Sequence, residues 1–137
     1  MNTIRDVKLL EFKELGDERG HLVVIEGEKG IPFAIKRVFY IFGSDPDAVR
    51  GQHANRRSEF FLINICGTSK IKAVDQNGDE KIITLDRPNM GVYLPTMLWK
   101  DMYGFSPDSI LLVLSSEHYD GNEYIRDFDE FIGGVKK

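Results

Sequence analysis

Short β-like runs follow one another along most of this chain, with turn residues between them and no helical pattern separating them. Runs of apolar, β-branched and aromatic residues alternate with clusters of Gly, Asn, Asp and Pro, and Asn77-Gly78 has the sequence of a tight hairpin turn. The predicted strands span 7–12, 21–26, 35–42, 59–66, 69–73, 80–85, 91–94 and 109–114. Strands at this spacing predict an all-β sandwich or barrel, and the very apolar run 109–114 is expected to be a central strand.

The C-terminal segment has a different pattern. Tyr124, Phe128 and Phe131 lie with two isoleucines at helical spacing, and glycines follow them. This pattern predicts a short helix over 122–132 that docks on the barrel through the three aromatic side chains. No internal repeat or long linker interrupts the chain, so we expect one domain spanning 1–137.

Composition and charge limit the possible functions. The 137 residues are 42% hydrophobic and 29% charged, which suits a globular domain with a single core. The net charge of −4 argues against general affinity for nucleic acid or anionic membranes, although a few local cations suffice to bind a nucleotide. The N-terminus lacks the apolar stretch of a secretory signal, and no run has the length of a membrane span, so we expect a cytoplasmic protein. The single cysteine, Cys66, lies in an apolar run and is expected to be buried and inert.

The segment Arg50-Gly-Gln-His-Ala-Asn55 is the best candidate for a site, because it places three strongly polar side chains between two predicted strands. Such residues are poor material for a core, since each needs a polar partner when buried. A solvated turn is the ordinary alternative. The barrel expected around the segment favours a pocket instead. Trp99-Lys-Asp-Met102 is the second candidate segment.

Several segments together resemble the sugar 3,4-ketoisomerases of the cupin superfamily, the group of the WxcM-like proteins. The matching segments are Arg19-Gly20, Ile31-Pro-Phe, Lys36-Arg-Val-Phe-Tyr40, Arg50-Gly-Gln-His-Ala, Gly91-Val-Tyr-Leu, Trp99-Lys-Asp-Met-Tyr103, Leu111-Leu-Val-Leu-Ser115 and Tyr119-Asp-Gly-Asn-Glu-Tyr-Ile-Arg126. A cupin motif alone is a weak signal, whereas this ordered set extends over nearly the whole chain and is specific.

The resemblance implies a jelly-roll β-barrel that holds a dTDP-linked keto sugar in its mouth. It implies an isomerase that converts a dTDP-4-keto-6-deoxyhexose to the 3-keto isomer for deoxy-amino-sugar biosynthesis, without a cofactor. It also implies a homodimer, in which we expect the N-terminal strand 7–12 to pair across subunits, because this strand is otherwise a vulnerable sheet edge.

The predicted catalytic residues follow from the chemistry of that reaction. Moving a ketone from C4 to C3 requires removal of the C3 proton, an enediol(ate), and return of a proton at C4. His53 is the expected base, because an imidazole titrates near neutral pH. We expect His21 and His118 to be surface or structural residues. Lys100 is expected to stabilise the enediolate or, if burial lowers its pKa, to act as the acid. Tyr40 completes the predicted set by holding the substrate.

The resemblance also implies a set of substrate-binding residues: Arg50, Asn55, Arg37, Arg19 and Trp99. The guanidinium fork of Arg50 suits a diphosphate, and Arg37 is the second phosphate candidate. Asn55 occupies a position where the family usually has a second His; it donates hydrogen bonds but does not titrate. Lys100 likewise replaces a His or Arg that is common in the family. An ion pair or a packed aromatic remains the alternative for each of these side chains.

Three functions remain open. The first is the ketoisomerase with His53 as base. The second is a non-catalytic sugar-nucleotide-binding cupin, which the Asn at position 55 favours. The third is a 3,5-epimerase-like enzyme, which also forms an enolate beside a ketone. The retained Arg50, His53, Tyr40 and Trp99 favour the isomerase. We expect no metal site, because only Glu59 accompanies His53 as a possible ligand.

Overall fold

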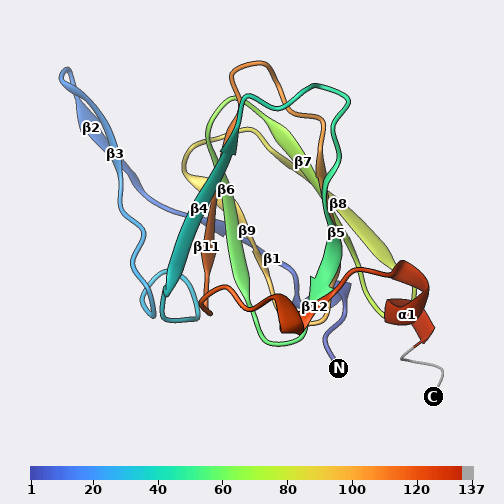
Figure 1. Ribbon diagram of the computed structural model, residues 1–137. Coiled ribbons are helices and arrows are strands. Elements are labelled where there is room, and N and C mark those ends of the chain that lie inside the picture. The colour runs from blue at the N-terminus through green and yellow to red at the C-terminus, as the bar shows by residue number, and fades with distance from the viewer. Residues whose placement is uncertain (134–137) are drawn as a thin grey trace.

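The computed structural model describes residues 1–133 as an all-β barrel with a projecting hairpin and a short C-terminal helix (Figure 1). The strands are β1 (Lys8–Glu11), β2 (Glu14–Asp17), β3 (Gly20–Val23), β4 (Arg37–Phe42), β5 (Arg50–Asn55), β6 (Phe60–Cys66), β7 (Ser69–Val74), β8 (Glu80–Leu85), β9 (Met90–Leu94), β10 (Trp99–Tyr103), β11 (Ile110–Ser115) and β12 (Tyr124–Ile125). The helical elements are η1 (Ile4–Asp6), η2 (Gly121–Glu123) and α1 (Phe128–Gly133). No helix within the described residues is long and apolar enough to cross a membrane.

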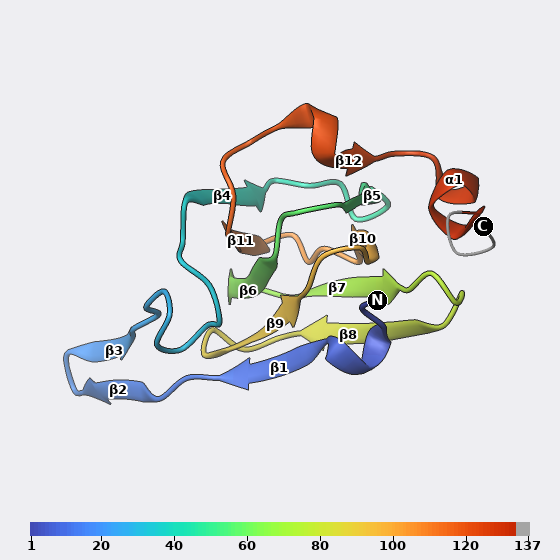
Figure 2. The same cartoon turned by 90° about the horizontal axis from the view of Figure 1, so that it is seen from below.

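Two five-stranded antiparallel sheets make up the barrel. Their strand orders are β1-β9-β6-β11-β4 and β12-β5-β10-β7-β8. Figure 2 shows them as two layers, with the hairpin at one end of the molecule and α1 at the other. The predicted all-β class is therefore confirmed. Strand β11 lies between β6 and β4, inside its sheet, as its apolar sequence predicts.

The main core lies between the two sheets. Phe60 and Leu62 of β6 face it, together with Ile71 of β7 and Leu111 of β11, and all four are at most 3% exposed. Alternate residues of β6 point to the outer face of the same sheet, where Phe61 joins a second cluster under the segment 24–36. The first five residues of β6 are thus buried on both faces, which explains why four of them are apolar.

The predicted tail helix over 122–132 is wrong in its first half. Tyr124 and Ile125 form β12, which pairs with Asn55 and Ala54 of β5, and α1 begins only at Phe128. The backbone hydrogen bonds offered by the free edge of β5 outweigh the helical spacing of the side chains. 

Docking of the helix also differs from the prediction. Phe131 is 1% exposed and packs near Ala54, Val74 and Trp99. Phe128 is 42% exposed and packs against the rings of Trp99 and Phe131. Phe131 is therefore the anchor of α1, and Phe128 is a partly solvated neighbour.

A two-stranded hairpin lies where the sequence predicted only one strand, over 21–26. Strand β2 pairs with β3 in the register Glu14↔Val23 to Asp17↔Gly20, and the hairpin projects from the barrel (Figure 1). Its preceding strand β1 occupies the edge of the first sheet, as expected, and pairs there with β9. 

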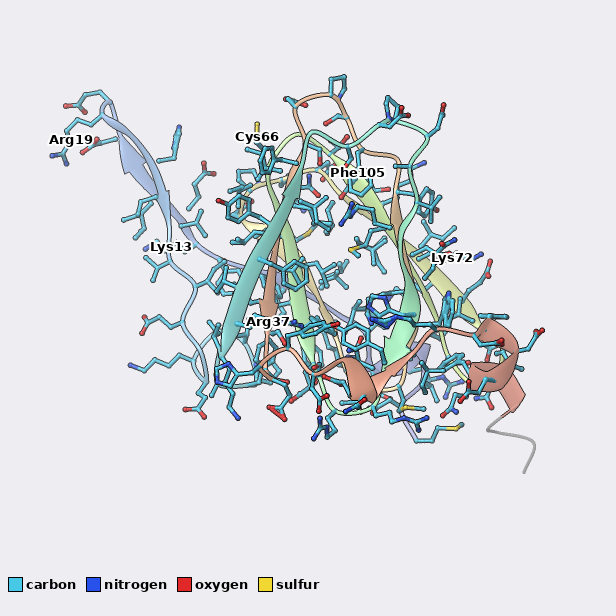
Figure 3. The ribbon with its side chains drawn as sticks, in the orientation of Figure 1. Lys13, Arg19, Arg37, Cys66, Lys72 and Phe105 are labelled. Carbon is cyan, nitrogen blue, oxygen red and sulfur yellow. The ribbon has the colours of Figure 1, made fainter. Side chains whose placement is uncertain are left out.

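The prediction of a buried Cys66 is wrong. The residue is the last of β6, and its side chain is exposed beyond the end of the core (Figure 3). The apolar run extends to the end of β6, but its last two residues lie beyond the part of the strand that other residues cover.

Candidate active site

A cavity of about 380 Å³ opens between the edge strand β4 and strand β5. Its wall includes side chains from β6, β10, β11 and the tail. The residues predicted to be catalytic, His53, Lys100 and Tyr40, all line it, and so do the predicted phosphate ligands Arg37 and Arg50. Five of the eight predicted site residues, from three strands, therefore meet in one place.

A β-bulge in β5 aims His53 into this cavity. His53 lies opposite Lys100 and Gly51 lies opposite Asp101, so Gln52 has no partner on β10. Gly51 and Gln52 both have positive φ, of 84° and 56°. A Cβ on Gly51 would lie 2.8 Å from the Lys100 carbonyl oxygen, so only glycine lets the two strands approach this closely.

The hydrogen bond of His53 defines its tautomer. Its Nδ1 lies 2.9 Å from the carbonyl oxygen of Gly51, which can only accept, so Nδ1 carries the proton and Nε2 keeps a lone pair. Burial lowers the pKa of His53 to about 4, and the positive charge of Lys100 adds to that effect. The imidazole is therefore neutral at physiological pH and has the form that a base requires.

Lys100 is buried, with 3% of its surface exposed. Its Nζ donates to Oδ1 of Asn55 at 3.0 Å and lies 4.8 Å from the centroid of the Phe60 ring. Burial lowers the pKa of Lys100 to about 7, although the charge of Glu123 acts in the opposite direction. An ammonium that loses its proton near neutral pH can both stabilise an anion and donate a proton.

Positive charge predominates at the cavity. Arg37, Arg50 and Lys100 contribute to its wall, and no carboxylate does so among residues 1–133. Arg37 donates to the hydroxyl of Tyr124 at 3.3 Å, while its buried Nε has no partner within the described part of the chain. Tyr40 stacks on Phe42 at the rim and is 61% exposed. The arrangement suits an anionic ligand with an apolar or aromatic portion.

Three predicted binding residues lie outside the cavity wall. Asn55 is 1% exposed and lies behind Lys100, to which it is hydrogen-bonded. Trp99 packs against α1 and faces a shallower depression beside Arg126. Arg19 lies at the tip of the hairpin, paired with Asp17 and remote from the labelled Arg37 (Figure 3). 

The structure also separates the possible metal ligand from the base. Glu59 accepts a hydrogen bond from the hydroxyl of Tyr93 and does not line the cavity. His21 and His118 are exposed, as predicted.

Sequence reasoning missed the tail's contribution to the site. Tyr119 and Tyr124 line the cavity, and the ring of Tyr124 lies 4.7 Å from that of His53. Glu123, one residue earlier, is a buried carboxylate at 2% exposure. The helical spacing of the tail concealed these roles. The sequence signal that remained was the dense series of polar and aromatic residues in Tyr119–Arg126.

Two facing antiparallel sheets form a cupin-type barrel. A neutral His, a buried Lys and two arginines meet in one cavity of this barrel, which suits an anionic ligand. The chain belongs to the family described as "FdtA: WxcM-like, C-terminal", whose model matches residues 5–136. The resemblance stated from the sequence is thereby confirmed.

Similar proteins cover nearly the whole chain. The TDP-4-oxo-6-deoxy-alpha-D-glucose-3,4-oxoisomerase of Aneurinibacillus thermoaerophilus is 42% identical over 124 residues, which cover 90% of this chain and 88% of that protein. The crystal structure of a 3,4-ketoisomerase from Helicobacter canadensis has 42% identity and a TM-score of 0.91, covering 96% of this chain and 98% of that one. The 3,4-ketoisomerase QdtA from Thermoanaerobacterium thermosaccharolyticum, in complex with TDP, has the same identity and TM-score, with 96% and 95% covered.

Proposed function

We propose that this protein is a sugar-nucleotide isomerase that converts a dTDP-4-keto-6-deoxyhexose to its 3-keto isomer by proton transfer through an enediol(ate). The observation that carries the proposal is the meeting of a neutral His53 and a buried Lys100 in one cavity of a chain from this family. The relatives support the substrate class, since QdtA was crystallised with TDP and, as a variant, with TDP-4-keto-6-deoxyglucose.

His53 is the base that removes the C3 proton. Its Nδ1 is held by the Gly51 carbonyl, so Nε2 faces the reaction with a lone pair. A pKa of about 4 makes the free imidazole a weak base. The diphosphate of the substrate brings negative charge toward the same cavity, and this charge raises the pKa of His53 toward the range in which general bases work best.

Lys100 stabilises the charge that develops on the enediolate and returns a proton at C4. Its ammonium lies on β10, directly across from His53 on β5, so both groups reach one ligand. Fixed charge in a buried site stabilises a transition state more than it does in water, because the dielectric is lower and no solvent must reorganise. The bond to Asn55 fixes where that charge lies.

Arg37 and Arg50 bind the diphosphate, and Tyr40 holds the sugar or base at the rim. The unpartnered Nε of Arg37 provides a donor that a phosphate oxygen satisfies. Asn55 acts through Lys100 in this scheme, since it lies behind the ammonium. The binding-module and epimerase alternatives explain less, because a module needs no neutral imidazole beside a buried ammonium.

Incubation with dTDP-4-keto-6-deoxyglucose in deuterated water tests the proposal. We expect loss of the C3 proton signal, deuterium at C4 and a new 3-keto product by NMR. Deuterium at C5 would indicate epimerisation. Unchanged substrate in the presence of protein that binds dTDP would indicate a non-catalytic module.

We further propose a homodimer in which the N-terminal strand pairs across subunits. The outer edge of β1 has no partner strand within residues 1–133, and the hairpin that follows exposes Leu22 at 58%. A second copy would bring Arg19 from the projecting hairpin to a cavity that its own chain does not let it reach. A cytoplasmic location remains a prediction.

Mass measurement and mixed subunits test this assembly. We expect a dimeric mass at micromolar concentration by sedimentation. If Arg19 acts across subunits, inactive Arg19→Ala and His53→Asn proteins regain activity when they are mixed, because one site per mixed dimer is intact. A monomeric mass, or no recovery on mixing subunits shown to exchange, would contradict the proposal.

A further inference from the structure

We propose that Glu123 is a positioning residue for the isomerase: through Asn55 it holds Lys100 in place and in its ammonium form, although it lies outside the cavity. The inference deepens the proposed function and rests on the role assigned there to Lys100. It gives the C-terminal tail a part in the chemistry beyond packing.

The first argument is the cost of burying this carboxylate. Glu123 accepts hydrogen bonds from the backbone N–H groups of Arg57 at 2.9 Å and Ser58 at 2.8 Å, and from the Ser58 hydroxyl. No cation forms a direct ion pair with it within the described residues. A buried charge without an ion pair is costly, even when it is well hydrogen-bonded. A neutral Gln in this position would form similar bonds more cheaply, so the charge itself needs an explanation.

Asn55 connects this charge to Lys100. Its Oδ1 accepts from the ammonium at 3.0 Å, so its Nδ2 lies on the other side of the amide, and the side chain helps to lower the pKa of Glu123. Nδ2 makes no hydrogen bond within residues 1–133. The backbone places the two residues close together, because Tyr124 pairs with Asn55 and the Glu123 carbonyl accepts from the Arg56 N–H at 3.0 Å. An amide oriented in this way joins an ammonium on one side to a carboxylate on the other.

Among the groups around Lys100, Glu123 is the carboxylate whose charge raises the pKa of Lys100. Strand β5 presents the neutral His53 and Asn55, β6 presents the ring of Phe60, and the tail presents Glu123. Arg126 of the tail acts on His53, whose pKa it lowers. Burial alone would lower the pKa of Lys100 below about 7, and the Glu123 charge opposes this shift. Part of the ammonium population at neutral pH therefore depends on a tail residue.

The pH profile of turnover tests this dependence. If the ammonium is the active form, kcat/KM falls as pH rises through the pKa of Lys100. Glu123→Gln keeps the size and the acceptor oxygen but removes the charge, so we expect the falling limb to move to lower pH by roughly half a unit or more. At pH values above the pKa of Lys100, this shift corresponds to a loss of about threefold or more in kcat/KM.

Asp120→Asn is the matched control. Asp120 is the N-cap of the same η2 element and pairs with the exposed Arg57, so the variant removes one tail charge and keeps the cap. We expect its falling limb to coincide with that of the parent. An equal shift in both variants would show that only the total charge of the tail matters, and this would overturn the proposal.

A direct titration does not depend on activity. In protein labelled with ¹³C-lysine, the Cε signal that disappears in Lys100→Met reports the ionisation of Lys100. We expect its midpoint to fall in Glu123→Gln and, if that variant does not fold, in Asn55→Ala, which interrupts the same path. An unchanged midpoint in a folded variant, with turnover reduced equally at all pH values, would make Glu123 purely structural and overturn the proposal.

The titration also separates this inference from the proposed function. If the parent protein fails to exchange the C3 proton, the isomerase proposal fails, but the Lys100 midpoint still reports whether Glu123 supports the ammonium. If exchange occurs, but neither the pH profile nor the Lys100 midpoint changes in Glu123→Gln, the isomerase proposal stands and this inference is wrong.

Discussion

The hairpin β2–β3 and the strand pair β5–β10 are both antiparallel, and each brings a cation close to polar partners. In the hairpin, Arg19 and Asp17 approach to 2.7 Å, with 85% and 42% of their side chains exposed. In the barrel, Lys100 bonds to Asn55 with 3% and 1% exposed. Both regions therefore contain a hydrogen-bonded cation, which is exposed to water in the hairpin and buried in the barrel.

Solvent determines what each cation can do. Water already stabilises the guanidinium and the carboxylate in the hairpin, so their contact adds little to stability. Burial removes that solvation from Lys100 and lowers its pKa to about 7. The hairpin charge remains ordinary and available to a partner, whereas the barrel charge becomes reactive.

The largest expected effect follows from removing the base on the barrel side. His53→Asn should lower turnover by about 10²–10⁴-fold, because the positioned acceptor for the C3 proton is lost. His21→Asn, on the exposed hairpin, is the control and should leave the rate unchanged. Steady-state kinetics with dTDP-4-keto-6-deoxyglucose measures both. A parent-like rate in His53→Asn would show that another group is the base.

Removal of the buried ammonium should follow closely. Lys100→Met should lower turnover by about 10²–10³-fold, as for loss of one group that stabilises a developing oxyanion, with a smaller effect on dTDP affinity. The change also leaves the buried Oδ1 of Asn55 without its hydrogen-bond donor, so the melting temperature should fall by a few degrees. Lys72→Met, on the neighbouring strand β7 and paired with Glu80 at 3.2 Å, is the control. Equal losses in both variants would remove the special role of Lys100.

The packing of α1 on the barrel should depend mainly on one aromatic side chain, Phe131. Phe131→Ala should lower the free energy of unfolding by about 3 kcal/mol, because it leaves a cavity under α1. Phe128→Ala, with a ring that is 42% exposed, should cost less than about 1.5 kcal/mol. Urea denaturation compares them. The opposite order would contradict the docking seen here.

Stability should also depend on pH through His53. Its pKa is about 4 in the folded protein and 6.5 when unperturbed, so between these values the unfolded chain binds a proton that the folded one does not. Stability is therefore lost as pH falls from 6.5 to 4, by an amount on the order of 2–3 kcal/mol. The loss should be smaller in His53→Asn than in the parent in denaturation curves at several pH values. Identical pH dependence would refute the assignment.

The smallest effect is expected at the exposed ion pair. Asp17→Asn should leave the melting temperature unchanged, because both partners are solvated before and after the change. Differential scanning calorimetry at one protein concentration checks this, and a clear fall in the melting temperature would show that the ion pair contributes to stability.

The sequence predicted the apolar strands because period-two and continuous apolar patterns reflect burial directly. It did not predict β5 and β10, whose sequences contain polar residues of the cavity. Strand β11 shows this, since its first five residues are apolar and two strands flank it. The tail defeated the same reasoning. Its aromatics have helical spacing, yet Tyr124 and Ile125 pair with β5, because an open sheet edge nearby satisfies their backbone groups. A local pattern contains no information about that edge.

The candidate site divides along the same line. The sequence by itself determined the residue types and the family resemblance, and from these we predicted eight site residues. Five of them, His53, Lys100, Tyr40, Arg37 and Arg50, line one cavity. Only the tertiary structure decided that Asn55 accepts a hydrogen bond from Lys100, that the Glu123 carboxylate is buried, and that Arg19 does not line the cavity of its own chain. The physical reason is that the state of a polar group depends on its solvation and its neighbours, and both come from distant parts of the chain.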